Sequence, residues 1–364
     1  MEEVKISKRL WNSLGKHAEK GEKYILRPKD KETGLRRIMA CRDFADVKKG
    51  DLGGFVVSTN NLSHEGNCWI YDNAKVLGKH SYVTDNAQLR DNAVLSGGSD
   101  IRGNAIVSGN AKLINASQAS GNSKAYDNAV VDNAFLHGSS QIYEDARLTN
   151  SSLYDNAKLH GKVKMWEYSH LRNSAEVFGS ADLYRSDVSD NAKVFGEADL
   201  NEAKIYGDAT VGGKVRVSDS EIYENAKVYG EESYQITHYS KIYGHAEVSG
   251  AFYISNSDVY DNARISDNAR LDGSCVRGNA KLKDFAWIRR CSIFENAVVG
   301  GNSFLEECKI HGDLEITEQI HIAYYEAYSP TDYEETEKGN GVIEKIKKLE
   351  EWRNPETPYY LALK

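Results

Sequence analysis

A short marker, Ser-x-Ile-Tyr-x, returns at almost constant spacing through most of this sequence. Successive first residues are mostly 17 positions apart, with one step of 18 and one of 20. These first residues are Ser151, Ser169, Ser186, Ala203, Ser220, Ser240, Ser257, Ser274, Cys291 and Cys308, and the series extends backward to Ser81, Ser99, Ala116 and Ala134. Such a period is typical of a repeat protein in which each unit contacts only its neighbours.

Between the markers, a six-residue unit of the form Asn-Ala-x-Val-x-Gly recurs, for example from Asn104 to Gly109. Its alanine and its aliphatic residue are two positions apart, so both point to the same face of an extended segment. Asn and Gly stand where the chain must turn, because they tolerate left-handed backbone angles. Each unit therefore predicts a short strand followed by a corner.

One five-residue side and two six-residue sides make a triangular coil of about 17 residues. We therefore predict an all-β fold, a single-stranded parallel β-helix over residues 66–317. Stacked alanines and branched aliphatics, such as Ala157 and Val177, are predicted to fill its interior. Cys291 and Cys308 fall in the serine series and are predicted to act as small buried hydrophobes.

A β-helix needs a cap at each end, because an uncovered end coil is an open sheet edge. Residues 1–65 are predicted to form a small α+β cap with a helix near 8–18 and a hairpin over 24–44. Residues 318–364 are predicted to be a second cap or a subunit-contact segment. It would contain a Tyr/Glu-rich stretch (324–337) and a short charged helix (342–352).

Charge and composition exclude several function classes. The net charge is −8 and the basic residues are interspersed with acidic ones, which argues against a nucleic-acid partner. The first residues hold no apolar run, so we expect neither a signal peptide nor a membrane anchor and predict a cytoplasmic protein. The five cysteines are odd in number and form no CxxC pair, which predicts reduced thiols and no metal site.

Two parts of the sequence resemble known proteins. The pattern aliphatic-x-x-Asn-Ala-x resembles the hexapeptide repeat of LpxA-like transferases. The segment from Cys41 to Gly50, followed by Gly53-Gly54-Phe55-Val56, Asn61-Leu62-Ser63 and Cys68-Trp69-Ile70-Tyr71, is similar to YdcK-like proteins, which bacteria and phages carry and which are labelled acetyltransferases from their repeats. The resemblance implies a left-handed helix, a homotrimer and, if the chain is an enzyme, acetyl-CoA as donor. Here, however, Gly falls one place later than in many hexapeptide transferases and many coils have 17 residues rather than 18, so a right-handed helix is the alternative.

The same resemblance implies a histidine base on the outer surface. The candidate histidine lies in the one coil in which the repeat is interrupted. Residues 231–239 replace a six-residue side there and place His238, the candidate base, beside the carboxylates of Glu231 and Glu232. Glu231, Glu232 and Tyr239 are also candidate binding residues. A histidine oriented by a carboxylate suits proton abstraction near neutral pH. The other interpretation is a surface bulge of solvated polar residues.

A column of tyrosines follows the inward aliphatic residue of the five-residue side. Its members are Tyr206, Tyr223, Tyr243 and Tyr260. Tyrosine is enriched in interfaces, so the column predicts a partner-binding strip or a subunit interface. Alternatively, the rings stabilise one side of the helix by cross-strand contact.

Three functions remain open from the sequence. The first is a non-catalytic, oligomeric binding or scaffold protein that uses the outer faces of the helix to hold a protein or a small molecule. The second is an acyl-CoA-dependent acetyltransferase with His238 as its base. The third, which rests only on the phage relatives, is a phage-type structural or host-interference protein.

Overall fold

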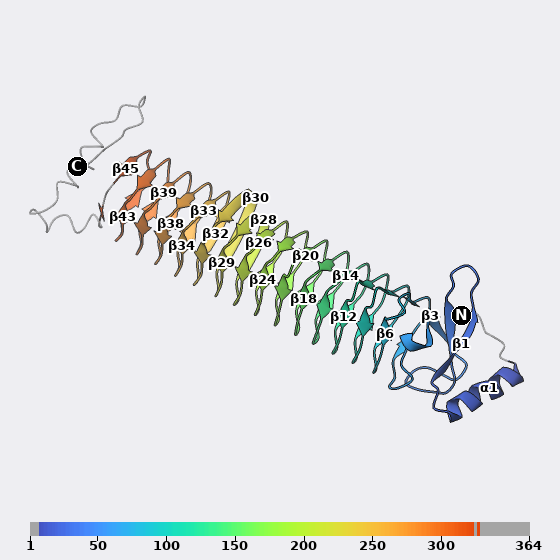
Figure 1. Ribbon diagram of the computed structural model, residues 1–364. Coiled ribbons are helices and arrows are strands. Elements are labelled where there is room, and N and C mark those ends of the chain that lie inside the picture. The colour runs from blue at the N-terminus through green and yellow to red at the C-terminus, as the bar shows by residue number, and fades with distance from the viewer. Residues whose placement is uncertain (1–6, 324–325, 328–364) are drawn as a thin grey trace, which may run out of the picture. The chain divides into compact units, whose positions relative to one another are not determined.

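The computed structural model describes residues 7–323 and 326–327. The chain forms two compact units, residues 1–185 and residues 186–364. In each unit, short parallel strands follow one another around successive coils (Figure 1). The predicted parallel β-helix with about 17 residues per coil is confirmed, while its left-handed sense stays a prediction.

The first unit begins with helix α1 (Lys8–Glu19), whose residue Leu14 packs against Met39 and Cys41. Strands β1 (Tyr24–Lys29) and β2 (Arg36–Ala40) form the expected antiparallel hairpin. Strand β3 (Leu52–Val56) pairs antiparallel with β2 and parallel with β5, so the hairpin continues directly into the coils. A 3₁₀ helix, η1 (Thr59–Asn61), precedes the first complete coil.

The remaining strands of the first unit stack along three sides. The first side holds β4 (Trp69–Ile70), β7 (Gln88–Leu89), β10 (Ile106–Val107), β13 (Lys124–Ala125), β16 (Gln141–Ile142), β19 (Lys158–Leu159) and β22 (Glu176–Val177). The second side holds β5 (Lys75–Val76), β8 (Val94–Leu95), β11 (Lys112–Ile114), β14 (Val130–Asp132), β17 (Arg147–Thr149), β20 (Lys164–Trp166) and β23 (Asp182–Tyr184). The third, shorter side holds β6 (Tyr82–Val83), β9 (Asp100–Ile101), β12 (Gln118–Ala119), β15 (Phe135–Leu136), β18 (Ser152–Leu153) and β21 (His170–Leu171).

The second unit has the same three sides. The first holds β25 (Lys193–Val194), β32 (Glu247–Gly250), β35 (Arg264–Ile265), β38 (Lys281–Leu282), β41 (Val298–Val299) and β44 (Glu315–Ile316). The second holds β26 (Asp199–Asn201), β33 (Tyr253–Ser255), β36 (Arg270–Asp272), β39 (Trp287–Arg289), β42 (Phe304–Glu306) and β45 (His321–Ala323). The third holds β24 (Asp187–Val188), β27 (Lys204–Ile205), β29 (Glu221–Ile222), β31 (Lys241–Ile242), β34 (Asp258–Val259), β37 (Cys275–Val276), β40 (Ser292–Ile293), β43 (Lys309–Ile310) and β46 (Glu326–Ala327).

Two long strands of the second unit, β28 (Thr210–Ser218) and β30 (Lys227–Thr237), run from the first side onto the second without a break. They pair in parallel, but their register shifts between Gly213 and Val215. Gly213 lies opposite Gly230, whereas Val215 lies opposite Tyr234. Part of the extra length of the 20-residue coil is therefore absorbed on β30, ahead of His238.

The interior of each unit consists of the predicted alanine and aliphatic columns. Ala157 and Leu159 in the first unit, and Ala226 and Val228 in the second, have no exposed surface. At about 25 cal/mol per Å² of apolar area removed from water, these columns are the main source of stability. The alternation of buried and exposed residues along each strand is the pattern read from the sequence.

The corners depend on left-handed residues whose side chains bind the next coil. Asp85 has φ 58°. Its carboxylate oxygen Oδ2 accepts the backbone N–H of Gly103 at 2.8 Å. Asp91 does the same for Gly109 at 2.8 Å. These contacts satisfy amide groups that turn away from the strand pairing at a corner.

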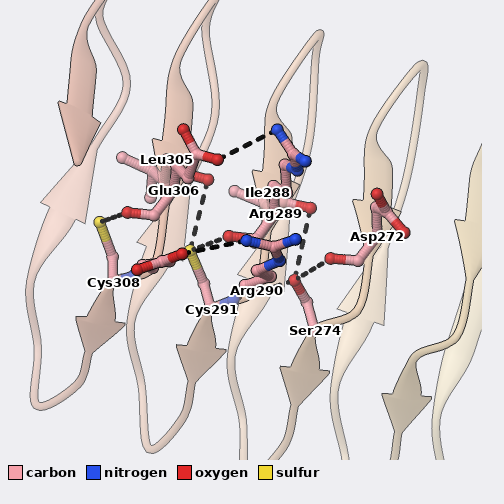
Figure 2. A network of polar contacts seen from close by, with 10 residues as sticks. Asp272, Ser274, Ile288, Arg289, Arg290, Cys291, Leu305, Glu306 and Cys308 are labelled. Atoms are coloured by element: carbon pink, nitrogen blue, oxygen red, sulfur yellow. Dashed lines mark hydrogen bonds and ion pairs between the residues drawn. The ribbon is translucent and has the colours of Figure 1, made fainter. Parts of the chain in front are cut away.

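Within each unit, the serine series forms a buried column of hydrogen bonds, which we call the serine column. Ser257 accepts the backbone N–H of Ser274 at 3.0 Å, and Ser274 accepts that of Cys291 at 3.1 Å. Cys291 and Cys308 are free thiols in this column. Both are buried, as predicted, and Figure 2 shows that they also take part in the polar network of the column, a role that the sequence did not indicate.

One member of the series was assigned to the wrong residue. Ser117, not Ala116, donates its backbone N–H to the Ser99 hydroxyl, at 3.0 Å. Asn115 and Ala116 both adopt left-handed angles, with φ 53° and 61°, and so place one extra residue at the corner. The preceding coil is 18 residues long for this reason, and the column continues through Ser117.

Most of the predicted C-terminal segment, including the helix at 342–352 and all of the stretch at 324–337 except residues 326–327, lies outside the described residues. The boundaries proposed at residues 65 and 317 stay predictions. Within the part of the chain that the structure describes, no helix has the length and apolar character needed to cross a bilayer.

Candidate functional site

His238 lies at the corner between strands β30 and β31 of the second unit. It has φ 41°, and the next residue, Tyr239, has φ 58°. The ring nitrogen Nδ1 lies 3.3 Å from the carboxylate oxygen Oδ2 of Asp219, and the His238 side chain is 65% exposed. The structure therefore presents a carboxylate-oriented imidazole to solvent, the arrangement of a general base.

Asp219 occupies the equivalent corner of the preceding coil. It has φ 48°, and its carbonyl oxygen accepts the backbone N–H of Tyr239 at 2.9 Å. That bond fixes the two corners against each other and brings the carboxylate to the imidazole. Asp219, and not the predicted Glu231 or Glu232, is therefore the carboxylate recorded beside the ring of His238.

The other residues of the interrupted coil contribute less to a site. Glu231 and Tyr239 are exposed, and Tyr239 has the largest exposed fraction of any described large hydrophobic residue, 78%. The side chain of Glu232 lies outside the described residues. The binding roles predicted for these three residues stay predictions.

The tyrosine column is a continuous stack of rings, which we call the tyrosine stack. Tyr206, Tyr223, Tyr243 and Tyr260 lie 4.8 Å apart between successive ring centroids and within 6° of parallel. All four are half-buried. Partial burial, with the neighbouring Tyr206 and Tyr243 phenols, raises the pKa of Tyr223 to about 12. Much of the ring surface that a partner could contact is thus covered by the rings above and below.

A second group of aromatic side chains, not predicted from the sequence, lies along the second side of the second unit and at the corner before β39. We call this group, Tyr253, Phe285, Trp287, Phe304 and His321, the aromatic face. Trp287 is 46% exposed and Phe285 is 62% exposed. The Trp287 and Phe304 rings are 4.8 Å apart, and the Phe304 and His321 rings are 4.6 Å apart. Exposed, clustered aromatic rings of this kind are enriched at protein interfaces.

Two histidines of the first unit also have polar partners on neighbouring coils. His160 has Nδ1 3.7 Å from Glu144 and Nε2 3.4 Å from Glu176, and its side chain is only 19% exposed. The Ser120 hydroxyl lies 2.7 Å from Nδ1 of His137. The partners are 16 or 17 residues apart, so such pairs can be recognised only when the sequence is aligned coil by coil.

The first unit also contains a shallow depression of about 320 Å³. Its lining residues are Asn128, Asp145, Arg147, Lys162 and Lys164. It is open and charged rather than enclosed and apolar, so it lacks the character of a typical small-molecule site. Among the described residues, no group of His, Cys, Asp or Glu is arranged to hold a metal ion.

Comparisons with known proteins agree on the repeat. Residues 263–279 match the family described as "YdcK Beta solenoid repeat". A stretch of 63 residues is 38% identical to "Uncharacterized acetyltransferase YdcK" of Escherichia coli strain K12. That match covers 17% of this chain and spans about a fifth, 19%, of the length of the relative.

A solved structure from Desulfovibrio desulfuricans G20, named a "putative acetyltransferase", aligns with 71% of this chain and 77% of its own. It has 12% sequence identity and a TM-score of 0.18, values too low to support any argument about this protein. The resemblance to YdcK-like proteins therefore rests on the matched repeat and the 63-residue stretch. This chain is a parallel β-solenoid with a YdcK-type repeat, similar in part of its sequence to YdcK of Escherichia coli.

Proposed function

We propose that this protein catalyses acyl transfer and that His238 is the base that activates the acceptor. The observation that carries the proposal is the 3.3 Å contact between His238 Nδ1 and Asp219 Oδ2 on an exposed corner. The description of the YdcK relative as an acetyltransferase agrees with this chemistry. A carboxylate on Nδ1 favours the tautomer whose other nitrogen, Nε2, can accept a proton.

In this proposal, an acceptor hydroxyl or amine approaches Nε2 of His238 and gives up its proton as it attacks the acyl carbon. Asp219 keeps the ring oriented and stabilises the imidazolium that forms. A positioned base of this kind contributes about 10²–10⁴-fold to the rate. The exposure of the ring gives the acceptor access from solvent.

Several basic side chains of the second unit are paired with acidic side chains of neighbouring coils. Lys204 is paired with Glu221 at 3.5 Å, Lys214 with Glu197 at 3.5 Å, and Arg216 with Asp199 at 2.7 Å. Their charges are therefore already compensated by neighbouring coils. We therefore assign no residue to the acyl donor, and the proposal concerns the activation of the acceptor.

The test is a thiol-release assay with acetyl-CoA and a panel of small amines and sugar alcohols. His238→Ala should lower the rate by at least about 100-fold. His160→Ala, which changes another carboxylate-flanked histidine, should leave the rate unchanged. Equal rates for wild type and His238→Ala would remove His238 from the mechanism, and acetyl-CoA turnover by neither protein would count against acyl transfer altogether.

A second candidate function, a binding or scaffold role, is favoured by the aromatic face. Three of its members, Tyr253, Phe285 and Trp287, each expose more than a third of their surface. Arg270 lies between Tyr253 and Trp287 in the strand pairing of the second side. Aromatic residues and arginine are the residue types that dominate interface energies.

We propose that the occupant of the aromatic face is a second copy of this chain, so that the protein is a homo-oligomer. Sedimentation velocity on the full chain tests this. The double variant Phe285→Ser/Trp287→Ser should sediment as a smaller species than wild type. Tyr168→Ser, which removes an exposed aromatic residue from the first unit, is the matched control. A monomeric wild type, or an unchanged assembly in the double variant, would argue against this role.

A further inference from the structure

A lysine and a cysteine are buried together where the N-terminal hairpin meets the first coil. Lys23 immediately precedes β1, Cys68 immediately precedes β4, and neither has any exposed surface. The amine nitrogen Nζ of Lys23 lies 3.2 Å from the sulfur of Cys68. Such pairs are unusual, because lysine is almost never fully buried without a charged partner.

The surroundings hold the amine in place beside the sulfur. Lys23 Nζ lies within hydrogen-bond distance of the carbonyl oxygens of Cys68 (2.9 Å), Glu65 (3.2 Å) and Gly66 (3.4 Å). On one side the Phe44 ring centroid lies 5.3 Å from Nζ. The amine therefore has little freedom to move away from the thiol.

Burial also favours the uncharged forms of both groups. Desolvation lowers the pKa of the Lys23 amine, which the neighbouring Cys68 partly offsets. Desolvation raises the pKa of the Cys68 thiol, against an opposing contribution from Lys23. A neutral amine has a lone pair on nitrogen, which a protonated one lacks, and can form a new bond.

We propose that Lys23 and Cys68 are a modification site at which dioxygen joins Nζ to Sγ through one bridging oxygen atom. The S–H bond and one N–H bond break, and an S–O bond and an O–N bond form. Sulfur and nitrogen each give up two electrons, and the four electrons reduce dioxygen to the bridging oxygen and one molecule of water. The contact distance of 3.2 Å requires little movement for the bridge to close.

The bridge would fasten the hairpin to the coils. It links residues 23 and 68, so it closes a loop that is otherwise held only by non-covalent contacts. A covalent link of this kind restricts the unfolded chain and raises resistance to unfolding. Because a thiol reductant cleaves the S–O bond, the effect would be reversible, unlike oxidation of the cysteine to a sulfonic acid.

The buried Cys41 provides an internal comparison. It packs with Leu14 and Met39 and also has no exposed surface. Cys41 should not cross-link, because burial of the thiol does not by itself place an amine at bonding distance from the sulfur. Cys275 is partly exposed. Its oxidation therefore shows that dioxygen is active in the sample.

The experiment is peptide mapping of the full wild-type chain, folded and held in oxygen-saturated buffer, with and without later treatment by dithiothreitol. We expect one cross-linked tryptic product joining residues 21–29 to residues 50–75, with one oxygen gained, two hydrogens lost and no cleavage after Lys23. Dithiothreitol should restore the two separate peptides, and Lys23→Gln and Cys68→Ser should not form the product.

Two results would overturn the proposal. In the first, Cys68 becomes a sulfinic or sulfonic acid while trypsin still cleaves after Lys23. In the second, Cys68 stays a free thiol in a sample in which Cys275 is oxidised. Because both are read on the wild-type chain, neither depends on whether a variant folds.

Discussion

The sulfur of Cys291 accepts the backbone N–H of Cys308 at 3.2 Å, the place that the hydroxyl of Ser274 holds for the N–H of Cys291 at 3.1 Å (Figure 2). The thiol of Cys291 in turn donates to the carbonyl oxygens of Arg289 at 3.1 Å and Leu305 at 3.3 Å. Serine and cysteine thus share one role along the column. Both satisfy a backbone amide that the neighbouring corner has turned away from the strand pairing.

This role predicts different outcomes for two substitutions at position 291. Cys291→Ser keeps an acceptor for the Cys308 amide, so the free energy of unfolding should change by less than about 1 kcal/mol. Cys291→Ala leaves that buried amide without an acceptor and should cost about 1–3 kcal/mol. Urea denaturation followed by circular dichroism measures both. If the two variants are equally stable, the sulfur acts only by filling space.

Two glycines with the same backbone angle separate conformational strain from crowding between coils. Gly21 and Gly161 both have φ +83°. A Cβ on Gly21 meets nothing within 4 Å, whereas a Cβ on Gly161 would lie 2.4 Å from the carbonyl oxygen of Gly179. Gly21→Ala should therefore cost only the left-handed strain of about 1–2 kcal/mol.

Gly161→Ala carries the same strain plus the overlap with the next coil, which should add about 1–3 kcal/mol. Thermal unfolding of the two variants under identical conditions gives the comparison. Equal losses of stability would mean that the coils can separate at this corner without cost.

Because the tyrosines of the stack ionise less readily in the folded protein, we predict that the protein loses stability in alkaline solution. An unfolded tyrosine ionises with a pKa of about 10. Partial burial raises the pKa of Tyr223 and of Tyr260 to about 12, and the hydrogen bond with Cys275 adds to the effect at Tyr260. Since the folded pKa is raised, this contribution to stability is fully present below about pH 10 and is lost as the pH rises through about 12.

Ultraviolet absorbance of tyrosinate measures this directly. Between the two pH values, the folded protein should show less tyrosinate than the same protein in urea, and Tyr223→Phe should reduce that difference. Coincident titration curves for the folded and unfolded chains would show that the stack does not disfavour ionisation.

Asp219 should act on catalysis through His238 rather than on substrate directly. Asp219→Asn keeps the size of the side chain but removes the charge that stabilises the imidazolium. We expect kcat to fall by up to the roughly 10²–10⁴-fold that the base contributes, with KM nearly unchanged. Asp199→Asn, which removes another carboxylate paired across neighbouring coils, should leave kcat unaltered. A change confined to KM would assign Asp219 to binding instead of positioning.

The period of the sequence was sufficient to predict the coils because side-chain packing follows it rigidly. Ser257 and Ser274 lie on consecutive coils of one column, as their spacing of 17 required. The failure at Ala116 has a local cause. Asn115 and Ala116 both have left-handed backbone angles, so Ser117 takes the next position in the column. The spacing between serines does not reveal which of the adjacent residues Ala116 and Ser117 takes that position.

The site was less predictable than the fold. Pairing of His238 with Asp219 depends on how two corners of different length align, and that alignment is set by the bond from Tyr239 N–H to the Asp219 carbonyl. The carboxylates near His160 likewise come from the coils before and after it. Neighbours in the sequence are poor guides here, because the nearest side chains in space are about one coil away.

The corner that precedes the serine column tolerates added length. Residues 115–116, 167–168 and 238–239 each place two consecutive left-handed residues there, while the flanking strands keep their parallel partners. Residues inserted at this corner therefore leave the packing of the flanking strands unchanged. The same corner could evolve, or be engineered, to display a grafted peptide between Tyr239 and Ser240 without disturbing the coils on either side.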